Sequence, residues 1–502
     1  MVLEKKIDII MIREPLSKRF SLVKVKAGEN FNRRNTWGIS RIKIFTQRRD
    51  RPKWDVLKLA QEFNDKMMRI GILRCLRLLL FSLLALLLSG GIVWAIDLPK
   101  VIDRTNCGKY EDLLIPAMYR AVKRGDYVIA PGTLNFKYKH EKSFLEASAK
   151  NAGKFDINSH GDLIDKKTGK YPENIYGYPF PNIDLKDPKA GANMICNFNF
   201  QRYRFMASID NDRLMWIDNK GEERFIAGFD HRLYMNGRPP DQTIKNPDKV
   251  LTYEFQRILE PMSSRGTNTM SYIYIDDREN SDFAYIPAIR RIRQTTSTSR
   301  SDSYMGSDSW LDLHYMWAGK DSSMKWKLVG EKTVLASFTS PDLLQAEELP
   351  DGRVRRVFPY TDSHIKYGYQ DPNWKGAPWT PLNITYVPRK VWIVEQIPKD
   401  PNYNWGLHIN YVDQETYTIW YKEIYDKSGQ FRFWCIFTGH YAESPSGKNN
   451  TGDYDAKIFI DERIRHATSV NRSAHPDTFI YVPYPKLNPG YFSVNNFLLM
   501  SK

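Results

Sequence analysis

The chain has 502 residues, enough for one large domain or two ordinary ones, each with a hydrophobic core. Its formal net charge is +16, which raises nucleic acid or anionic lipid as partners, but residues 1–66 hold 17 Lys or Arg against 8 Asp or Glu, and Arg69, Arg74 and Arg77 add three more positive charges. Only +4 is left for residues 96–502, so the charge of this large part argues against nucleic acid as a partner.

Residues 1–66 are basic and show no pattern of a folded domain. A start codon assigned too early explains this extension, with Met67 or Met68 as the true beginning. The alternative is the cytoplasmic tail of an anchored protein.

Residues 67–95 have the pattern of a bacterial secretory signal peptide. A basic head precedes an apolar run at 78–88 and a Ser-Gly-Gly break, and Val93 and Ala95 occupy the small-residue positions before a cleavage point. The sequence therefore predicts export to the periplasm of a Gram-negative cell. A permanent inner-membrane anchor through 78–96 is the alternative, because this run is about long enough to span a bilayer.

Residues 96–191 predict a helix followed by a long coil. Apolar residues recur at helical spacing over 109–125, and the pattern stops on Gly125. Residues 126–192 are rich in Gly, Pro, Asn, Asp and Lys, which is typical of irregular coil, with a second short helix expected at 143–152.

Residues 192–502 predict consecutive antiparallel strands joined by turns. The strands are expected at 198–209, 212–218, 223–229, 268–275, 282–293, 389–397, 405–412, 416–425 and 430–437. Aromatic residues occur at both parities of several strands, so both faces of the sheet are expected to be covered. One face would pack on helices while the other lines a cavity, or the sheets would pack as an ordinary sandwich.

Cysteine and histidine patterns predict neither a disulfide framework nor a metal site. The three cysteines after residue 95, at 107, 196 and 435, match no disulfide spacing and are expected to be buried as small hydrophobic residues. The nine histidines are scattered, and no two have ligand spacing. No metal, cofactor-binding or catalytic residue is therefore assigned.

Residues 285–308, YIPAIRRIRQTTSTSRSDSYMGSD, combine a strand-like start with a cluster formed by Arg290, Arg291 and Arg293. A nucleic-acid groove would need a longer basic track with stacking platforms. The cluster suits one anionic head group, an ion pair with Asp302, Asp308 or Asp312, or a docking edge. These three possibilities stay open.

The runs AYIPAIRRIRQ, RSDSYMGSD and WKLVGE (326–331) resemble the bacterial family of predicted outer-membrane lipoprotein-sorting proteins, relatives of the periplasmic lipoprotein-localisation carrier. Residues 148–192 and the late strands KVWIVEQ and WYKEIYDKSGQ match the larger branch of that family. The resemblance covers most of residues 100–440. It implies a mainly β fold with flanking helices: a strongly curved antiparallel sheet, an incomplete β-barrel closed by helices, like the lipoprotein carrier.

The resemblance also implies a function, a periplasmic carrier or binding protein for a lipid, a lipoprotein acyl chain or another hydrophobic ligand. A transporter of the resistance-nodulation-division class is implied as a partner, and membrane contact is allowed. Tyr304 and Met305, beside Gly306, fit a mobile rim of such a pocket. The residues expected to bind ligand or to dock are Arg290, Arg291, Arg293, Tyr304, Met305, Asp308 and Trp310.

Two other classes of function compete with the carrier. Acidic residues with a histidine could form a carboxylate-based hydrolase, from Asp302, Asp308, Asp312, Glu331 and either His314 or His440. No nucleophile elbow, phosphate loop or dinucleotide fingerprint accompanies them, so an enzyme is not expected. A membrane-anchored scaffold without cargo is the other alternative.

Overall fold

The computed structural model describes residues 9–13, 20–24, 98–295, 297–356, 365–448, 450–472, 479–480 and 487–501. The chain divides into two compact units, Met1–Ile96 and Asp97–Lys502. In the first unit, β1 (Ile9–Arg13) and β2 (Phe20–Lys24) pair as antiparallel strands. The predicted signal peptide at 67–95 lies outside the described residues, so export and the roles assigned to 1–66 stay predictions.

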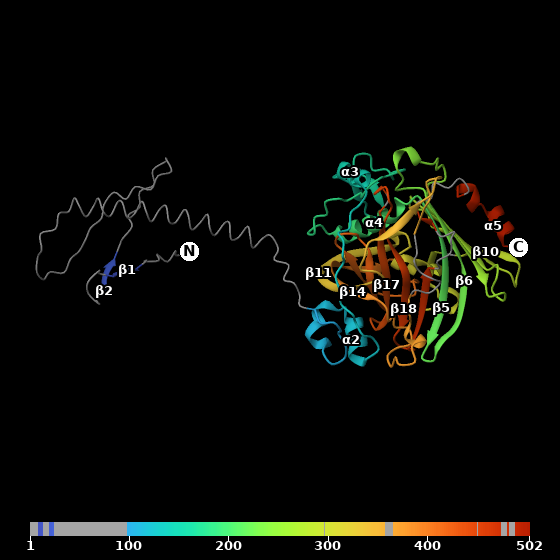
Figure 1. Cartoon of the computed structure of the whole chain (residues 1–502). Coiled ribbons are helices and arrows are strands. Elements are labelled where there is room, and N and C mark those ends of the chain that lie inside the picture. Colours follow the sequence, from blue (N-terminus) through green and yellow to red (C-terminus); the bar gives the residue numbers. More distant parts are fainter. Residues whose placement is uncertain are drawn as a thin grey trace, which may run out of the picture. The chain divides into compact units, whose positions relative to one another are not determined.

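The second unit contains four α-helices among its described residues (Figure 1). They are α2 (Pro116–Arg124), α3 (Lys142–Asn151), α4 (Ala190–Tyr203) and α5 (Val494–Met500). None of the helices in the described segments has the length and hydrophobicity that a bilayer crossing requires.

One sheet of 16 strands forms the body of the second unit (Figure 1). Its antiparallel series runs β10-β9-β8-β7-β6-β5-β19-β18-β17-β16-β15-β14-β11. The strands are β5 (Ala207–Asp218), β6 (Gly221–Tyr234), β7 (Val250–Glu260), β8 (Asn268–Tyr274), β9 (Ser281–Ile286), β10 (Arg291–Thr295), β11 (Met324–Phe338), β14 (Thr385–Pro398), β15 (His408–Asp413), β16 (Ile419–Tyr425), β17 (Phe431–Glu443), β18 (Asn450–Asp461) and β19 (His466–Arg472).

Three short strands, β12 (Leu344–Glu348), β13 (Val354–Arg356) and β20 (Phe479–Ile480), join the end of β17 to β5. A small separate hairpin pairs β3 (Phe155–Ile157) with β4 (Leu163–Asp165). In the described part of the chain β10 pairs only with β9, so the curved sheet is not closed into a barrel. The predicted fold class is therefore confirmed, except that β17 pairs in parallel with β11 and β12 and makes the sheet mixed.

Both predicted N-terminal helices form. The first is divided into a 3-10 helix at Cys107–Leu113 and α2, because Pro116 begins a new helix at its first turn. Gly125 ends α2 in the left-handed region at φ +84°, as its position in the sequence indicates. Helix α3 lies within one residue of its predicted bounds.

The prediction of a strand at 198–209 is wrong over its first half, which belongs to α4, whereas residues 207–209 begin β5. Phe198, Phe200 and Arg202 alternate with polar residues and imitate the strand period. The helix is buried on nearly all sides, so the amphipathic period that reveals a surface helix is missing. Gly191 lets the helix lie directly on β11, since a Cβ there would meet the Leu328 backbone nitrogen at 2.9 Å.

Two further strand predictions need correction. Strand β5 runs through Asn211 and Asp212, where a turn was expected. The single return strand predicted at 282–293 is a hairpin of β9 and β10, with a turn at 287–290 and Arg290 at φ +47°. The four late strands expected between 389 and 437 correspond to β14, β15, β16 and β17.

The two faces of strands β5 to β9 are chemically different. On the outer face, apolar side chains pack against α5 and the 3-10 helix before it, as in the ring contact between Phe255 and Phe497 at 5.6 Å. On the inner face, the same strands carry Asp210, Arg232 and Glu254, all buried. This period-2 alternation assigns the apolar contacts to one side of the sheet and charge to the other.

Candidate functional site

A row of buried polar side chains crosses the inner face of the sheet from β6 to β9. Strand pairing places Arg232 on β6 opposite Glu254 on β7. It then places Ser271 on β8 between Glu254 and Asp282 on β9. Arg232 is 1% exposed and Asp282 is 2% exposed. Charges this deep must be paired inside the protein, because burying an unpaired charge is costly.

Arg300, from the loop after β10, supplies the counter-charge for this row. Its Nη1 lies 2.8 Å from Asp282 Oδ1 and its Nε lies 2.6 Å from Asp312 Oδ1. Its Nη2 lies 3.9 Å from Glu254 Oε2 and donates to the Ala318 carbonyl oxygen. Burial lowers the pKa of Arg300, but Asp282 and Asp312 outweigh it and raise that pKa above its usual value. The guanidinium therefore joins the sheet to the loop that covers it.

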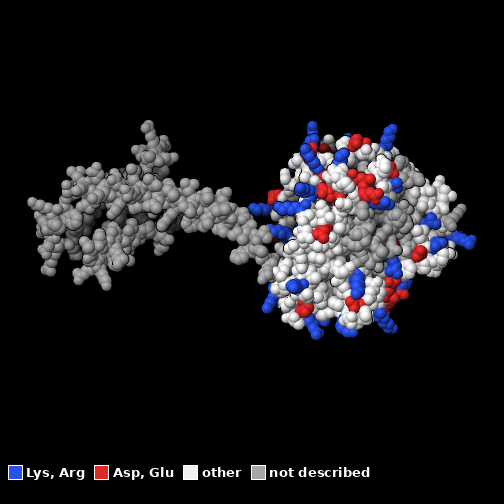
Figure 2. Space-filling model, viewed as in Figure 1, with Lys and Arg blue, Asp and Glu red and all other residues white. Residues whose placement is uncertain are grey.

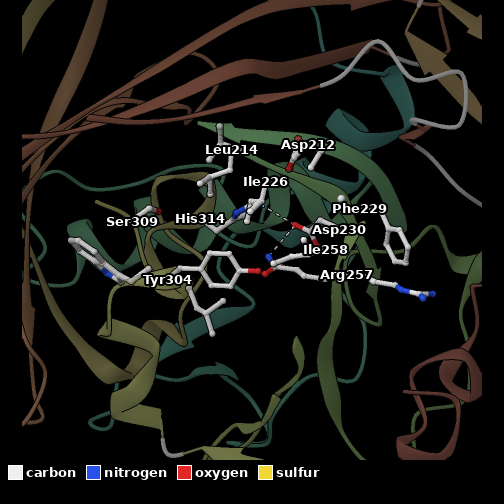
Figure 3. Close-up of a pocket in the computed structure, with 16 residues that line it drawn as sticks. Asp212, Leu214, Ile226, Phe229, Asp230, Arg257, Ile258, Tyr304, Ser309 and His314 are labelled. Atoms are coloured by element: carbon white, nitrogen blue, oxygen red, sulfur yellow. Dashed lines mark hydrogen bonds and ion pairs between the residues drawn. The ribbon is translucent and has the colours of Figure 1, made fainter. Parts of the chain in front are cut away.

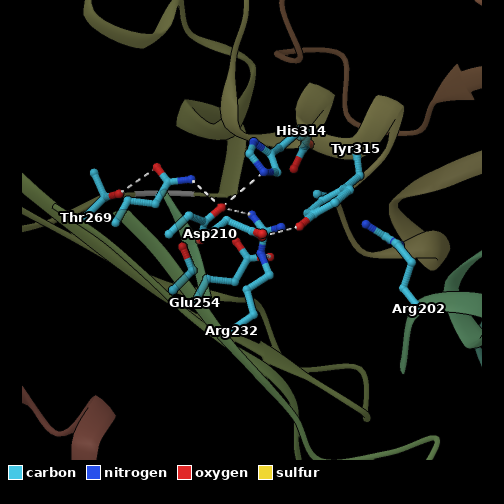
Figure 4. Close-up of polar contacts among 12 residues, drawn as sticks. Arg202, Asp210, Arg232, Glu254, Thr269, His314 and Tyr315 are labelled. Atoms are coloured by element: carbon cyan, nitrogen blue, oxygen red, sulfur yellow. Dashed lines mark hydrogen bonds and ion pairs between the residues drawn. The ribbon is translucent and has the colours of Figure 1, made fainter. Parts of the chain in front are cut away.

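A second buried ion pair lies beside the row, and Figure 4 labels its acid, Asp210, together with Tyr315. Arg472 on β19 places Nη2 at 2.7 Å from Asp210 Oδ1, with both side chains fully buried. Tyr315 donates its hydroxyl to Asp210 Oδ2 at 2.7 Å. The Arg472 guanidinium also lies 4.0 Å from the centre of the Tyr454 ring. Each charge is thus held by an opposite charge or by an aromatic face.

A cavity of about 80 Å³ lies next to this network and opens partly to solvent (Figure 3). Apolar side chains form most of its wall, namely Leu214, Ile226, Phe229, Ile258, Trp310, Leu311 and Val470. Asp212, Asp230 and His314 form its polar end. An apolar wall with a few convergent polar groups is the usual chemistry of a small-molecule pocket.

The polar end could hold a metal ion by its residue types. Asp212, Asp230 and His314 bring one ligand atom each to within 4.8 Å of one another. However, Arg232 Nη2 lies 2.7 Å from Asp230 Oδ2, and Lys457 Nζ lies 3.3 Å from His314 Nε2. A divalent cation would meet these two cations at close range. The three residues therefore fit an ion-pair network better than a metal centre.

The pKa values at the polar end follow from burial and from the nearest charges. Burial would raise the pKa of Asp230, but Arg232 and His314 outweigh it and hold that pKa below its usual value. Burial lowers the pKa of Lys457 to about 7, although Asp212 opposes the shift. The ammonium of Lys457, which lies next to His314 behind the polar end of the cavity, therefore loses its proton more readily than that of an exposed lysine.

Residues 302–311, here named the rim loop, cover the mouth of this cavity. Trp216 Nε1 donates to the Gly306 carbonyl oxygen at 3.0 Å, and Arg224 Nη2 donates to that of Met305 at 3.1 Å. Asp308 Oδ2 lies 2.5 Å from His466 Nδ1 and accepts from Thr468 Oγ1 at 2.8 Å. The loop is thus held to β5, β6 and β19 by a few polar contacts.

Four of the predicted ligand residues lie on the rim loop. Tyr304 and Trp310 line the cavity, and Trp310 stacks on Trp405 with ring centres 5.0 Å apart. Met305 is 38% exposed, and Asp308 anchors the loop as described above. The contacts of these four residues are all with other parts of the protein and do not test whether they bind a ligand. Their binding role therefore stays a prediction.

The three predicted arginines lie elsewhere, at the β9–β10 turn and on β10. Arg290, Arg291 and Arg293 are exposed, and none forms an ion pair with another described residue. The carboxylates considered as their partners are engaged by other groups: Asp312 by Arg300 and Asp308 by His466.

The residues considered for a hydrolase do not share one site in the described structure. Asp302 accepts from Asn404 Nδ2 at 2.7 Å, and Glu331 accepts from Gln414 Nε2 at 3.1 Å at the surface. His440 pairs with Asp455, with 2.7 Å between Nδ1 and Oδ2. Only His314 lies at the cavity, where its partner is Asp230.

Sequence reasoning missed the buried charges of the inner face, among them Arg232, Arg300 and Arg472. Each lies in a segment whose other residues look ordinary, because an isolated charge in a strand is typical of a solvent-exposed face. Opposite charges at matching parity in VLTYEFQRILE and GEERFIAGFDHRLY were the one available signal. The expected burial of Cys107, Cys196 and Cys435 as free thiols is confirmed.

The contact between Asp308 and His466 makes the rim loop sensitive to pH. Burial lowers the pKa of His466, but Asp308 outweighs it and raises that pKa above 6.5. A raised pKa means that the pair stabilises the fold fully below about pH 6.5 and is lost as pH rises through the folded value. We expect amide exchange at 304–311, corrected for its intrinsic pH dependence, to accelerate as pH rises above about 6.5.

His466→Gln is the matched variant, because it keeps a donor but cannot titrate. It should abolish the pH dependence and leave the Thr468 hydrogen bond in place. An equal pH response in the variant would show that another group controls the loop.

Comparison with solved structures finds distant likenesses. A domain named as a candidate outer membrane lipoprotein-sorting protein from Vibrio parahaemolyticus is 12% identical, with a TM-score of 0.42, over 62% of this chain and 100% of its own. A DUF1329 family protein from Desulfovibrio piger is 13% identical, with a TM-score of 0.41, over 62% of this chain and 100% of its own. A LolA superfamily protein from Nitrosomonas europaea is 10% identical, with a TM-score of 0.36, over 61% of this chain and 98% of its own. Likenesses this low identify no function.

No curated protein matches the chain. The model of the family DUF1329, described as a protein of unknown function, matches residues 101–497. Because this match spans most of the 502 residues, including the sheet, the rim loop and the cavity, the chain belongs to the DUF1329 family.

Proposed function

We propose that this protein is an exported carrier or binding protein for a hydrophobic ligand, such as a lipid or the acyl chains of a lipoprotein, in the periplasm. The observation that supports the proposal most directly is the apolar cavity on the inner face of a curved sheet, under a loop held by few contacts. A soluble carrier must hide acyl chains from water, and each buried methylene contributes about 0.8 kcal/mol.

The cavity must enlarge to accept such a ligand. At about 80 Å³ it is smaller than the roughly 300–1,000 Å³ of typical ligand pockets. Displacement of the rim loop would widen the cavity and its opening, since Tyr304 and Trp310 form one wall. The structure thus supports a closed state that opens to load.

Backbone strain at the rim loop favours such an opening. Met305 in the rim loop has φ of +54°, in the left-handed region that residues with side chains rarely adopt, and Tyr315 and Met316, just after the loop, have φ of +52° and +72°. Each such residue costs of order 1–3 kcal/mol, and strain of this kind gathers at ligand clamps and switches. Relief of the strain at Met305 would offset part of the free energy needed to break the hydrogen bonds that hold the loop closed.

The periplasmic location rests on the signal-peptide pattern at 67–95, and the transporter partner rests on the family resemblance. A scaffold anchored through 78–96 remains the competing function. The two differ in one property: a carrier holds lipid in a stoichiometric amount, whereas a scaffold does not.

Native mass spectrometry of the protein from the periplasmic fraction tests the proposal. We expect a mature chain that begins at Ile96 and carries a lipid adduct. Ile226→Trp fills the cavity and should reduce the adduct at least about ten-fold, since a bulky ring replaces the space for a chain. Tyr304→Ala with Met305→Ala should also change the loading, because these residues border the opening.

Leu185→Ala, an exposed leucine that does not line the cavity, is the control and should load like the unchanged chain. Circular dichroism of each variant checks the fold. A full-length mass without lipid would support the anchored scaffold, and full loading of Ile226→Trp would rule out this cavity as the binding site.

A further inference from the structure

We propose that one edge of the sheet is a docking surface for anionic lipid headgroups. Three segments form it, here named the edge patch: the β7–β8 turn (259–266), the β9–β10 turn with the start of β10 (286–293), and α5. Its exposed members are Leu259, Met262, Arg265, Ile286, Ile289, Arg290, Arg291, Arg293, Leu498 and Leu499. This surface is separate from the cavity and does not depend on a ligand there.

The three segments are in contact with one another. A Cβ placed on Gly266 would lie 3.5 Å from Pro287 Cγ and 3.5 Å from the Ser501 carbonyl oxygen. Asn268, just after the first turn, donates its Nδ2 to Ser501 Oγ at 2.7 Å and pairs across the sheet with Tyr285. Figure 1 places α5 and β10 together at one end of the second unit. The three segments of the edge patch therefore adjoin one another at this edge of the sheet.

Apolar side chains project from the tips of the edge patch. Met262 is 73% exposed and Leu499 is 68% exposed, while Ile286 and Ile289 are each 40% exposed. Side chains this exposed are not buried by the other segments of the edge patch. They suit shallow insertion into the headgroup and acyl boundary of a bilayer.

Positive charge surrounds these apolar tips. The edge patch contains four arginines, at 265, 290, 291 and 293, and one acidic residue, Glu260. The resulting +3 is most of the +4 carried by residues 96–502, and basic side chains project on the β10 side in Figure 2. None of the four arginines pairs with a described acid, so they are free to meet an anionic surface.

The strand edge itself argues against pairing with another chain. No described strand covers the outer edge of β10. Arg291 and Arg293 lie on that strand, and charged side chains on an edge strand oppose pairing with a second copy. A charged and apolar edge of this kind suits lipid better than a β-sheet partner.

Hydrogen–deuterium exchange of the full chain with vesicles localises the contact, because the basic residues 1–66 would confuse a simple binding assay. With vesicles of phosphatidylglycerol and phosphatidylcholine, we expect protection at 259–266, 286–293 and 494–501. The protection should vanish at high salt and with phosphatidylcholine alone, because an arginine near an anionic surface strengthens binding about five-fold.

The triple variant Arg290→Glu, Arg291→Glu, Arg293→Glu should lose this protection, with at least about 100-fold weaker contact at the edge patch. Lys166→Glu, Lys167→Glu, Lys170→Glu makes the same charge change at exposed lysines outside the patch and should keep it. Met262→Ser with Leu499→Ser should weaken protection in a manner independent of salt, whereas Leu145→Ser with Ile464→Ser should not.

Equal protection with neutral and anionic vesicles would overturn the proposal that the edge patch prefers anionic headgroups. Absence of protection with both would overturn the docking surface, and protection without vesicles in a dimer would assign the patch to a second copy. Lipid loading of the triple Glu variant in solution should be unchanged, so failure of the docking surface and failure of the carrier are distinguishable.

Discussion

Replacing Arg300 by methionine is expected to lower the free energy of unfolding by about 3–5 kcal/mol. The side chain is 1% exposed and lies within 4 Å of carboxylate oxygens from Asp282, Asp312 and Glu254. Its removal leaves these acids buried without their shared cation. Arg232 still pairs with Glu254, so the loss falls mainly on the other two. Chemical denaturation followed by circular dichroism measures the change.

Arg293→Met is the matched control, because it removes an exposed arginine a few residues away without an ion pair to a described acid. It should change stability by no more than about 0.5 kcal/mol. Adding Asp312→Asn to Arg300→Met should restore part of the loss, since one uncompensated charge is removed. Equal effects of Arg293→Met and Arg300→Met would contradict the assigned network.

Replacing Lys422 by methionine is expected to stabilise the protein by about 2–4 kcal/mol at pH 7. Lys422 is fully buried, and its Nζ donates to Gln396 Oε1 at 3.0 Å. Burial lowers its pKa from 10.5 to about 7. Each pKa unit corresponds to about 1.4 kcal/mol of the free energy of unfolding. Loss of the hydrogen bond to Gln396 lowers the gain by about 1 kcal/mol.

The pH dependence gives this prediction a sharper test. Between about pH 7 and about pH 10.5 the unfolded chain binds a proton at Lys422 that the folded chain has lost, so stability of the natural protein rises with pH. The advantage of Lys422→Met should therefore shrink as pH increases. Lys457→Met is the contrasting variant and should destabilise, because Lys457 is the positive charge that acts most strongly on the buried Asp212. A destabilised Lys422→Met would reveal an interaction of the ammonium that geometry does not show.

Much of the fold was readable from the sequence where local chemistry decides it. Pro116 and Gly125 mark the ends of α2, and the late strands lie where alternation and turn residues indicate. Helix α4 was not predicted, because a helix buried on nearly all sides has no polar face to reveal the helical period in the sequence. The β9–β10 turn was not predicted, because it contains no glycine, although Pro287 begins it.

The candidate site was readable only in part, because it is assembled across the chain. Tyr304 and Trp310 were chosen from one stretch and do line the cavity. Their neighbours Asp212 and Val470 lie far away in sequence, and only the pairing of β5 with β19 brings them together. The most conspicuous arginines proved to be exposed, whereas Arg300 in the same stretch is buried.

The contact between Arg300 and Asp312 ties together the two ends of an eleven-residue segment. Such an Ω-shaped loop is compact, because its ends lie close together and its own side chains pack inside it. Because closing a longer loop adds little entropy, its length and composition can vary without disturbing the sheet beneath it. Under the proposed carrier function, relatives could therefore change ligand by exchanging this segment alone, and a label placed near Met305 would report ligand binding.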